Sequence, residues 1–395
     1  KRLNGQHKLQ QIINNAGWLV FDKILRMGLG LFVGAWVARY LGPTQFGLMN
    51  YAISFVALFS ALATMGLDTI VVRNIVRDPA CSYETLGTTF VLKLIGGFVT
   101  CILSFALILI LRPGDSTSHW LVAIAGLTTL CQALDAIDFW FQSQVQSKYT
   151  VYAKNLAFLA VTSVKIALLL LKAPLIAFAW ANFAEITVGG IMLVVAYYMR
   201  GNSMFFWKAS FSQAKKLLRD SWPLILSSIM IMIYMRIDQV MLGQMASDKE
   251  VGIYSAAVRL AEAWYFIPMA VASSTLPSIV ELKALNEERF YEKLQKLYCL
   301  MAFMAYAVAI PATFFSEWVV TFLFGDAYGK AGMMLVLLIW SGIFTNLGVA
   351  RSSFLTTMNW TRIHFLTVFG GCIINVILNF LLIPIIGYWG AAYAT

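Results

Sequence analysis

Charged residues are scarce in this sequence. Asp, Glu, Lys and Arg together make up 12% of its 395 residues, whereas 60% of the residues are hydrophobic. A typical soluble domain carries about 25% charged residues, so this chain has too few polar side chains to cover a surface that faces water on all sides. We therefore expect most of the chain to lie in lipid.

Motifs of soluble enzymes and metal proteins are also missing. The sequence contains no GxxxxGK[ST] phosphate loop, no GxSxG nucleophile turn and no HExxH zinc motif, so ATP is excluded as an internal energy source. The five cysteines form no CxxC pair and the three histidines lie far apart, which argues against a metal site. We predict that the chain is not an enzyme and uses no cofactor other than a coupling ion, Na+ or H+.

What the sequence has instead is long apolar segments. A membrane-spanning helix needs about 20 mostly apolar residues, and eleven segments of that length can be marked between polar or Pro/Gly breaks, with a twelfth beginning at Trp389. We predict an all-α polytopic membrane protein with about 12 transmembrane helices. The eleven complete segments cover residues 14–38, 47–72, 86–111, 120–141, 149–171, 175–199, 221–245, 252–280, 294–324, 331–358 and 362–386.

The basic residues fall mainly in alternate loops. Sixteen Lys and Arg lie on the side of the N-terminus, and five lie in the loops of the other side: Arg39, Arg112, Lys172, Lys249 and Lys330. Cytoplasmic loops carry the excess of Lys and Arg, so we expect the N-terminus in the cytoplasm. Because these residues flank apolar segments and do not gather on a polar domain, the net charge of +10 does not indicate nucleic-acid binding.

One longer loop divides the segments into two sets of six. We expect an N-terminal six-helix bundle over residues 1–200, a cytoplasmic linker over 201–220 and a C-terminal bundle over 221–395, whose last helix is cut short. Phe205, Phe206 and Phe211 alternate with basic residues in the linker, which fits either an interfacial helix or a solvated connection. When the sequence is aligned with itself at a displacement of 205 residues, Gly47 aligns with Gly252. This is weak support for a duplicated unit with a central cavity between its two copies.

Charged residues inside the apolar segments are the functional candidates, because each costs about 2.5–3.5 kcal/mol at a helix centre unless it faces a partner or water. Basic residues occur in both halves, and Arg and Lys select anions such as phosphate. Asp22 with Arg26, and Arg259 with Glu262, are one turn apart and can also simply neutralise each other. The candidates for substrate binding are Lys23, Arg26, Lys93, Arg236, Arg259 and Arg351. The candidates for ion coupling are Asp22, Asp68, Asp138, Asp238 and Glu262.

Three stretches carry a resemblance to a known family. They are ARYLGPTQFGLMNYA at 38–52 followed by MGLDTIVVR at 65–73, RIDQVMLG at 236–243, and VGIYSAAVRLAE at 251–262. Together they resemble the polysaccharide flippases of the multidrug/oligosaccharidyl-lipid/polysaccharide exporter superfamily, in particular O-antigen repeat-unit flippases.

The resemblance implies two six-helix bundles that form a V-shaped cavity in the bacterial inner membrane. It implies transfer of an undecaprenyl-diphosphate-linked oligosaccharide from the cytoplasmic to the periplasmic leaflet by alternating access, with a polysaccharide polymerase and a chain-length regulator as partners. Three alternatives stay open: a cation-coupled multidrug exporter of the same fold, a membrane-embedded glycan polymerase or ligase, and a non-transporting scaffold.

Overall fold

A computed structural model describes the backbone of residues 2–395 and the side chains of these residues except 2–16, 19–21, 284 and 361. Lys1, Arg2 and Lys8, three of the basic residues used to predict the orientation, therefore lie outside the described side chains. Ten helical stretches in the described part of the chain are long and apolar enough to cross a membrane. This agrees with the predicted all-α polytopic class, while the number of twelve helices stays a prediction.

The chain forms two compact units. The first runs up to Val33 and from Ala52 to Arg236, and the second comprises Gly34–Tyr51 and Ile237–Thr395. Helices of the first unit are α1 (Arg2–Thr64, in part), α2 (Asp68–Arg77), η1 (Pro79–Cys81), α3 (Ser82–Leu111), α4 (Ser116–Cys131), η2 (Gln132–Asp135), α5 (Ala136–Ser143), α6 (Lys148–Leu170), α7 (Leu175–Met199), η3 (Met204–Phe206) and the beginning of α8 (Phe211–Met245).

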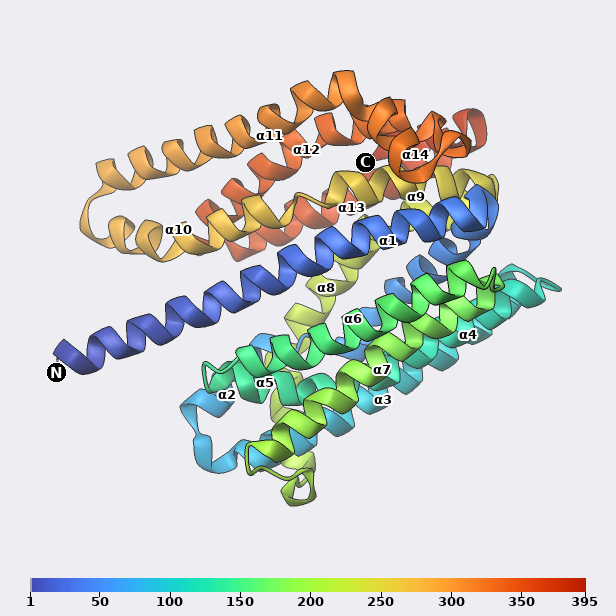
Figure 1. Ribbon diagram of the computed structural model, residues 1–395. Coiled ribbons are helices and arrows are strands. Elements are labelled where there is room, and N and C mark those ends of the chain that lie inside the picture. The colour runs from blue at the N-terminus through green and yellow to red at the C-terminus, as the bar shows by residue number, and fades with distance from the viewer. Residues whose placement is uncertain (1) are drawn as a thin grey trace. The chain divides into compact units, whose positions relative to one another are not determined.

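The second unit is built from the remaining helices. They are α9 (Asp248–Glu262), α10 (Phe266–Leu285), α11 (Glu287–Phe324), η4 (Asp326–Tyr328), α12 (Lys330–Thr357), α13 (Thr361–Ile386) and α14 (Tyr388–Ala394), together with the end of α8 and the middle of α1. In the first unit α6 packs on α7, and α4 on both α3 and α7, so these helices lie side by side (Figure 1). In the second unit α12 packs on α11 and α9.

Helix α1 changes direction at a Gly-Pro pair. Gly42 has φ 70° and ψ 169°, and Pro43 follows it. A glycine at positive φ ends a helix without steric cost, and proline fits the first turn of the next one. This local chemistry produces the break that separates the predicted segments 14–38 and 47–72.

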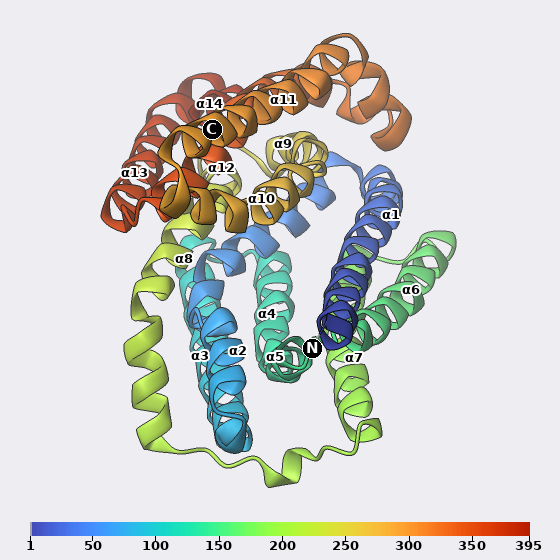
Figure 2. The same cartoon turned by 90° about the vertical axis from the view of Figure 1, so that its left-hand side faces the viewer.

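The linker between α7 and α8 is held against the first unit (Figure 2). The amide of Ser210 donates to Thr88 Oγ1 at 3.1 Å, and the indole of Trp207 donates to Tyr197 Oη at 3.3 Å. Between residues 201 and 210 the helical part is the three-residue η3, and Phe211 already begins α8. Phe205 and Phe211 remain 91% and 88% exposed, consistent with an interface position.

Close helix crossings in both units depend on glycine. In the first unit a Cβ on Gly96 would lie 2.1 Å from the carbonyl oxygen of Leu62. In the second unit a Cβ on Gly47 would lie 1.7 Å from the oxygen of Asp248, and one on Gly252 would lie 1.9 Å from the oxygen of Pro43. Small residues allow membrane helices to approach to backbone contact. Gly47 and Gly252, which the displacement of 205 residues aligns, therefore meet at one crossing.

We predict that Gly252→Ala destabilises the chain by about 1–3 kcal/mol, because the added methyl meets backbone that cannot move aside as a side chain does. Gly348→Ala in α12 is the matched control, since a Cβ there meets nothing within 4 Å. Thermal unfolding in detergent measures both. Equal melting temperatures for the two variants would contradict the tight crossing.

Candidate functional site

Asp238 lies at the centre of a buried polar cluster in the second unit. It belongs to α8 and is 4% exposed. Tyr254 Oη donates to its Oδ2 at 2.7 Å, Thr395 Oγ1 donates to the same oxygen at 2.8 Å, and Asn379 Nδ2 donates to Oδ1 at 2.9 Å. These three partners are uncharged side chains, and they come from three other parts of the unit.

A second layer of amides and carbonyls supports this cluster. Asn379 Nδ2 also lies 2.9 Å from the carbonyl oxygen of Asn375 and 3.2 Å from its Oδ1, while Asn375 Nδ2 donates to the oxygen of Ala394 at 3.2 Å. Thr395 Oγ1 also lies 3.0 Å from the oxygen of Ala391. Asn375 and Asn379 are one helical turn apart on α13, so both amides face the same neighbours.

The cluster has the composition of a small-cation or proton site. A buried carboxylate is costly unless its charge is compensated, and Asn379 Oδ1 is buried without a hydrogen-bond partner among the described atoms. Carboxylate, amide, hydroxyl and carbonyl oxygens are the ligands that hard cations prefer. The residues present therefore fit a cation held by Asp238, Asn379, Asn375 and Thr395.

A second charged cluster lies in the first unit. Lys154 donates to Asp135 at 2.9 Å and lies 3.3 Å from Asp138. Lys93 is 2% exposed, its ammonium lies 4.8 Å from the ring centroid of Phe139, and it is attracted electrostatically by Asp135 and Asp68. Three of the predicted candidates, Asp68, Lys93 and Asp138, are thus brought together. Lys154 thus pairs with carboxylates inside the first unit.

Asp22 and Arg26 form a third cluster, on α1, with residues of α6 and α7. Arg26 Nε lies 2.9 Å from Asp22 Oδ1 and donates to Asn155 Oδ1 at 3.1 Å. Glu185 lies 4.0 Å from Arg26 and 2.9 Å from Lys165. Asp22 and Arg26 are therefore close enough to neutralise each other, which is the alternative to a substrate role for this pair.

The other predicted residues are distributed over the two units. The guanidinium of Arg259 packs against Gly34, where a Cβ would lie 2.4 Å from Nη2. Lys23 and Arg351 are exposed, whereas Arg236 and Glu262 are partly buried. Lys23 and Arg236 belong to the first unit, and Arg259, Glu262 and Arg351 belong to the second. Their roles in binding or coupling stay predictions.

Sequence reasoning missed the uncharged members of these clusters. Tyr254, Asn375, Asn379 and Thr395 surround Asp238, and Asn155 joins Arg26. One signal was available: two asparagines one turn apart in the apolar segment 362–386 are expected to seek partners, since amides are costly in lipid.

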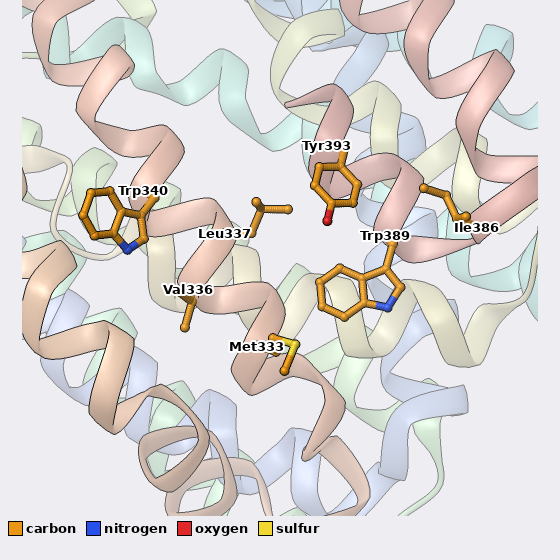
Figure 3. Close-up of a pocket in the computed structure, with 7 residues that line it drawn as sticks. All are labelled: Met333, Val336, Leu337, Trp340, Ile386, Trp389 and Tyr393. Carbon is orange, nitrogen blue, oxygen red and sulfur yellow. The ribbon is translucent and has the colours of Figure 1, made fainter.

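An apolar pocket of about 540 Å³ lies elsewhere in the second unit. Figure 3 shows Trp340 and Trp389 on either side of Leu337 and Met333, and the polar atoms of its labelled side chains are the two indole nitrogens and the Tyr393 hydroxyl. The lining side chains carry no charge. This pocket is therefore suited to an apolar chain and not to a diphosphate.

Family comparison places these clusters in context. Residues 12–283, more than half of the chain, match the family described as "Polysaccharide biosynthesis protein". The chain belongs to this family. Residues 223–381 also match the MatE family.

Named relatives of this chain are flippases and transporters. A provisionally named low-salt glycan biosynthesis flippase of Haloferax volcanii, Agl15, is 26% identical over 212 residues, which cover 53% of this chain and 44% of that relative. A second provisionally named flippase of the same organism, AglR, is 27% identical, and the matched stretch covers 36% of it. The chain thus spans less than half the length of these two. A provisionally named O-antigen transporter of Shigella flexneri is 22% identical over 351 residues, covering 85% of this chain and 82% of that one.

Solved structures confirm the all-α polytopic membrane fold. A multidrug resistance transporter of the MATE family superposes with a TM-score of 0.76 at 16% identity, covering 93% of this chain and 90% of that one. The lipid II flippase MurJ superposes with a TM-score of 0.69 at 16% identity, covering 97% and 84%. At these identities the likeness establishes the fold alone.

We predict that Tyr254→Phe lowers the free energy of unfolding by about 1–3 kcal/mol, because Asp238 loses a buried donor. Tyr393→Phe, an exposed tyrosine of the same unit, is the control and should change the melting temperature little. Thermal unfolding in detergent distinguishes them. A Tyr254→Phe variant as stable as the control would show that this hydrogen bond does not hold the cluster.

Proposed function

We propose that the chain is a flippase that moves an undecaprenyl-diphosphate-linked oligosaccharide from the cytoplasmic to the periplasmic leaflet of a bacterial inner membrane, with its N-terminus in the cytoplasm. The observation that carries the proposal is the family match over residues 12–283. The Shigella flexneri relative named for O-antigen transport, aligned over 85% of the chain, supports the same substrate class. The family-wide connection with polysaccharide synthesis suggests a polymerase and a chain-length regulator as partners.

In this proposal basic residues bind the diphosphate while the polyprenyl tail stays in lipid. Arginine suits phosphate because its guanidinium donates two parallel hydrogen bonds. Arg259 is the first choice, because its guanidinium tip reaches the backbone at Gly34. Alternating access, with the two units rocking about a central cavity, would carry the headgroup across.

Energy would come from a cation or proton that binds at Asp238. A ligand drives a conformational equilibrium only if it binds the two states differently. Asp238, Asn379 and Thr395 are held by hydrogen bonds that link α8, α13 and the end of the chain, so binding here would change how these elements pack. The sequence offers no ATP-binding motif that could supply energy instead.

A cation-coupled multidrug exporter is the second candidate. It is favoured by the MatE match over residues 223–381. The two candidates differ in cargo: an exporter of this kind would protect cells from cationic drugs, whereas a flippase would be needed for surface glycan.

Gene deletion in a host that displays the polysaccharide tests the proposal. We predict loss of surface glycan, accumulation of lipid-linked repeat units in the inner leaflet, and rescue by wild type. Arg259→Ala should reduce transfer about tenfold or more, since a lost hydrogen bond to a charged group is worth about 1.5–3 kcal/mol. Arg219→Ala, an exposed linker arginine, is the matched control and should rescue fully.

Two results would contradict the proposal. Surface glycan that persists in the deletion strain would refute a flippase role, and drug sensitivity in place of glycan loss would favour the exporter. Full rescue by Arg259→Ala at wild-type protein level would remove Arg259 from the diphosphate site but leave the flippase assignment standing.

A further inference from the structure

The cluster around Arg26 in the first unit differs from a phosphate site in its balance of charge. Its two cations, Arg26 and Lys165, each lie within 4.0 Å of a carboxylate, supplied by Asp22 and Glu185. Two positive and two negative charges leave a formal sum of zero. A diphosphate entering here would have to compete with both carboxylates, so the cluster is poorly suited to an anion.

The same side chains remain accessible. The exposed fractions are 29% for Arg26, 23% for Asp22, 17% for Lys165 and 23% for Glu185. They lie within stretches apolar enough to cross a membrane, where a charge facing lipid costs about 2.5–3.5 kcal/mol. Their pairing offsets much of this cost, and the exposed edges of these groups can be contacted by a polar solute on this face.

Aromatic rings accompany the polar groups. The guanidinium carbon of Arg26 lies 5.2 Å from the ring centroid of Phe158. One turn before Asp22, Trp18 meets Tyr152 with ring centroids 4.9 Å apart, and Tyr152 is 53% exposed. Residues 18, 22 and 26 are spaced by four and therefore share one face of α1. Residues 152, 155 and 158 are spaced by three and share one face of α6 in the same way.

This combination matches the chemistry of an uncharged sugar. Sugar hydroxyls donate to carboxylates and amide oxygens, accept from ammonium and guanidinium groups, and leave the C–H face of the ring to pack on aromatic side chains. Asp22 and Glu185 supply accessible acceptors, Arg26 and Lys165 supply donors, and Tyr152 supplies an exposed ring. Asn155 and Phe158 are buried behind them, where Asn155 Oδ1 accepts from Arg26 and Phe158 packs on its guanidinium. The opposed charges sum to zero, so the cluster has no net charge that would attract an anion or a cation.

We propose that the cluster Asp22, Arg26, Asn155, Lys165 and Glu185 is a subsite for the uncharged sugars of the lipid-linked glycan, separate from the residues that bind its diphosphate. The inference rests on the proposed flippase function and assigns Arg26 to the glycan rather than to phosphate. A purely structural role for the ion pairs is the competing explanation.

The test measures binding to the full chain in lipid nanodiscs with two probes. One is the lipid-linked repeat unit that accumulates in the deletion strain, and the other is undecaprenyl diphosphate without sugar. Asn155→Leu removes an amide at similar volume, and Glu185→Gln removes a charge while keeping the shape. Ser163→Ala on the same helix, whose hydroxyl donates to the oxygen of Leu159, is the control.

We expect wild type to bind the glycosylated probe more tightly than the bare diphosphate. Asn155→Leu and Glu185→Gln should each weaken binding of the glycosylated probe about tenfold and leave binding of the bare diphosphate unchanged, while Ser163→Ala changes neither. A purely structural role would move both affinities together, so an equal loss for both probes would overturn the subsite.

Equal affinity of wild type for the two probes would also overturn the subsite. Failure of wild type to bind either probe would instead overturn the proposed function. Melting temperatures of the variants show whether a loss of binding follows from unfolding. If Asn155→Leu does not fold, Glu185→Gln carries the test.

Discussion

Compensation of charge inside a lipid environment is the constraint on which the rest of this structure depends. A charged side chain at a helix centre costs about 2.5–3.5 kcal/mol unless it finds a partner or water. The first unit meets this cost with ion pairs, Arg26 with Asp22 and Lys154 with Asp135 and Asp138. The second unit surrounds Asp238 with hydroxyl and amide donors instead. The first arrangement brings opposite charges together, whereas the hydrogen-bond donors reported around Asp238 are uncharged.

This difference suggests that the two units bind different kinds of ligand. Neutralised pairs with accessible edges favour contacts to uncharged polar groups, and a buried single carboxylate favours a cation. Asp238 is hydrogen-bonded to Asn379 on α13 and to Thr395, so in the proposed mechanism a change in its charge state would alter the packing of these elements together. At the crossing of Gly47 and Gly252 the two backbones touch without side chains between them. The helices therefore have little room to move at this point.

Much of the fold could be predicted from sequence because lipid imposes simple rules. Most apolar segments lie within helices, but 47–72 is divided between α1 and α2, 120–141 between α4, η2 and α5, and 252–280 between α9 and α10. The Gly42-Pro43 break in α1 follows from local chemistry. Charged residues such as Asp138 and Asp238 could be identified as candidates because a charge is costly in lipid. Their partners could not, because Asn155, Asn379 and Thr395 are uncharged residues whose importance depends on which helices pack together. Asp68 and Lys93, 25 positions apart in sequence, likewise come together only through tertiary packing.

Cation-driven transfer of a lipid-linked glycan is the central claim, and it can be measured in proteoliposomes. The full chain would be reconstituted with the lipid-linked repeat unit, and the appearance of glycan in the opposite leaflet would be followed with and without an imposed gradient of Na+ or of pH. Wild type should transfer the glycan faster with one of these gradients, and Asp238→Asn should transfer it slowly under all conditions. Equal rates for both proteins, independent of either gradient, would contradict the account.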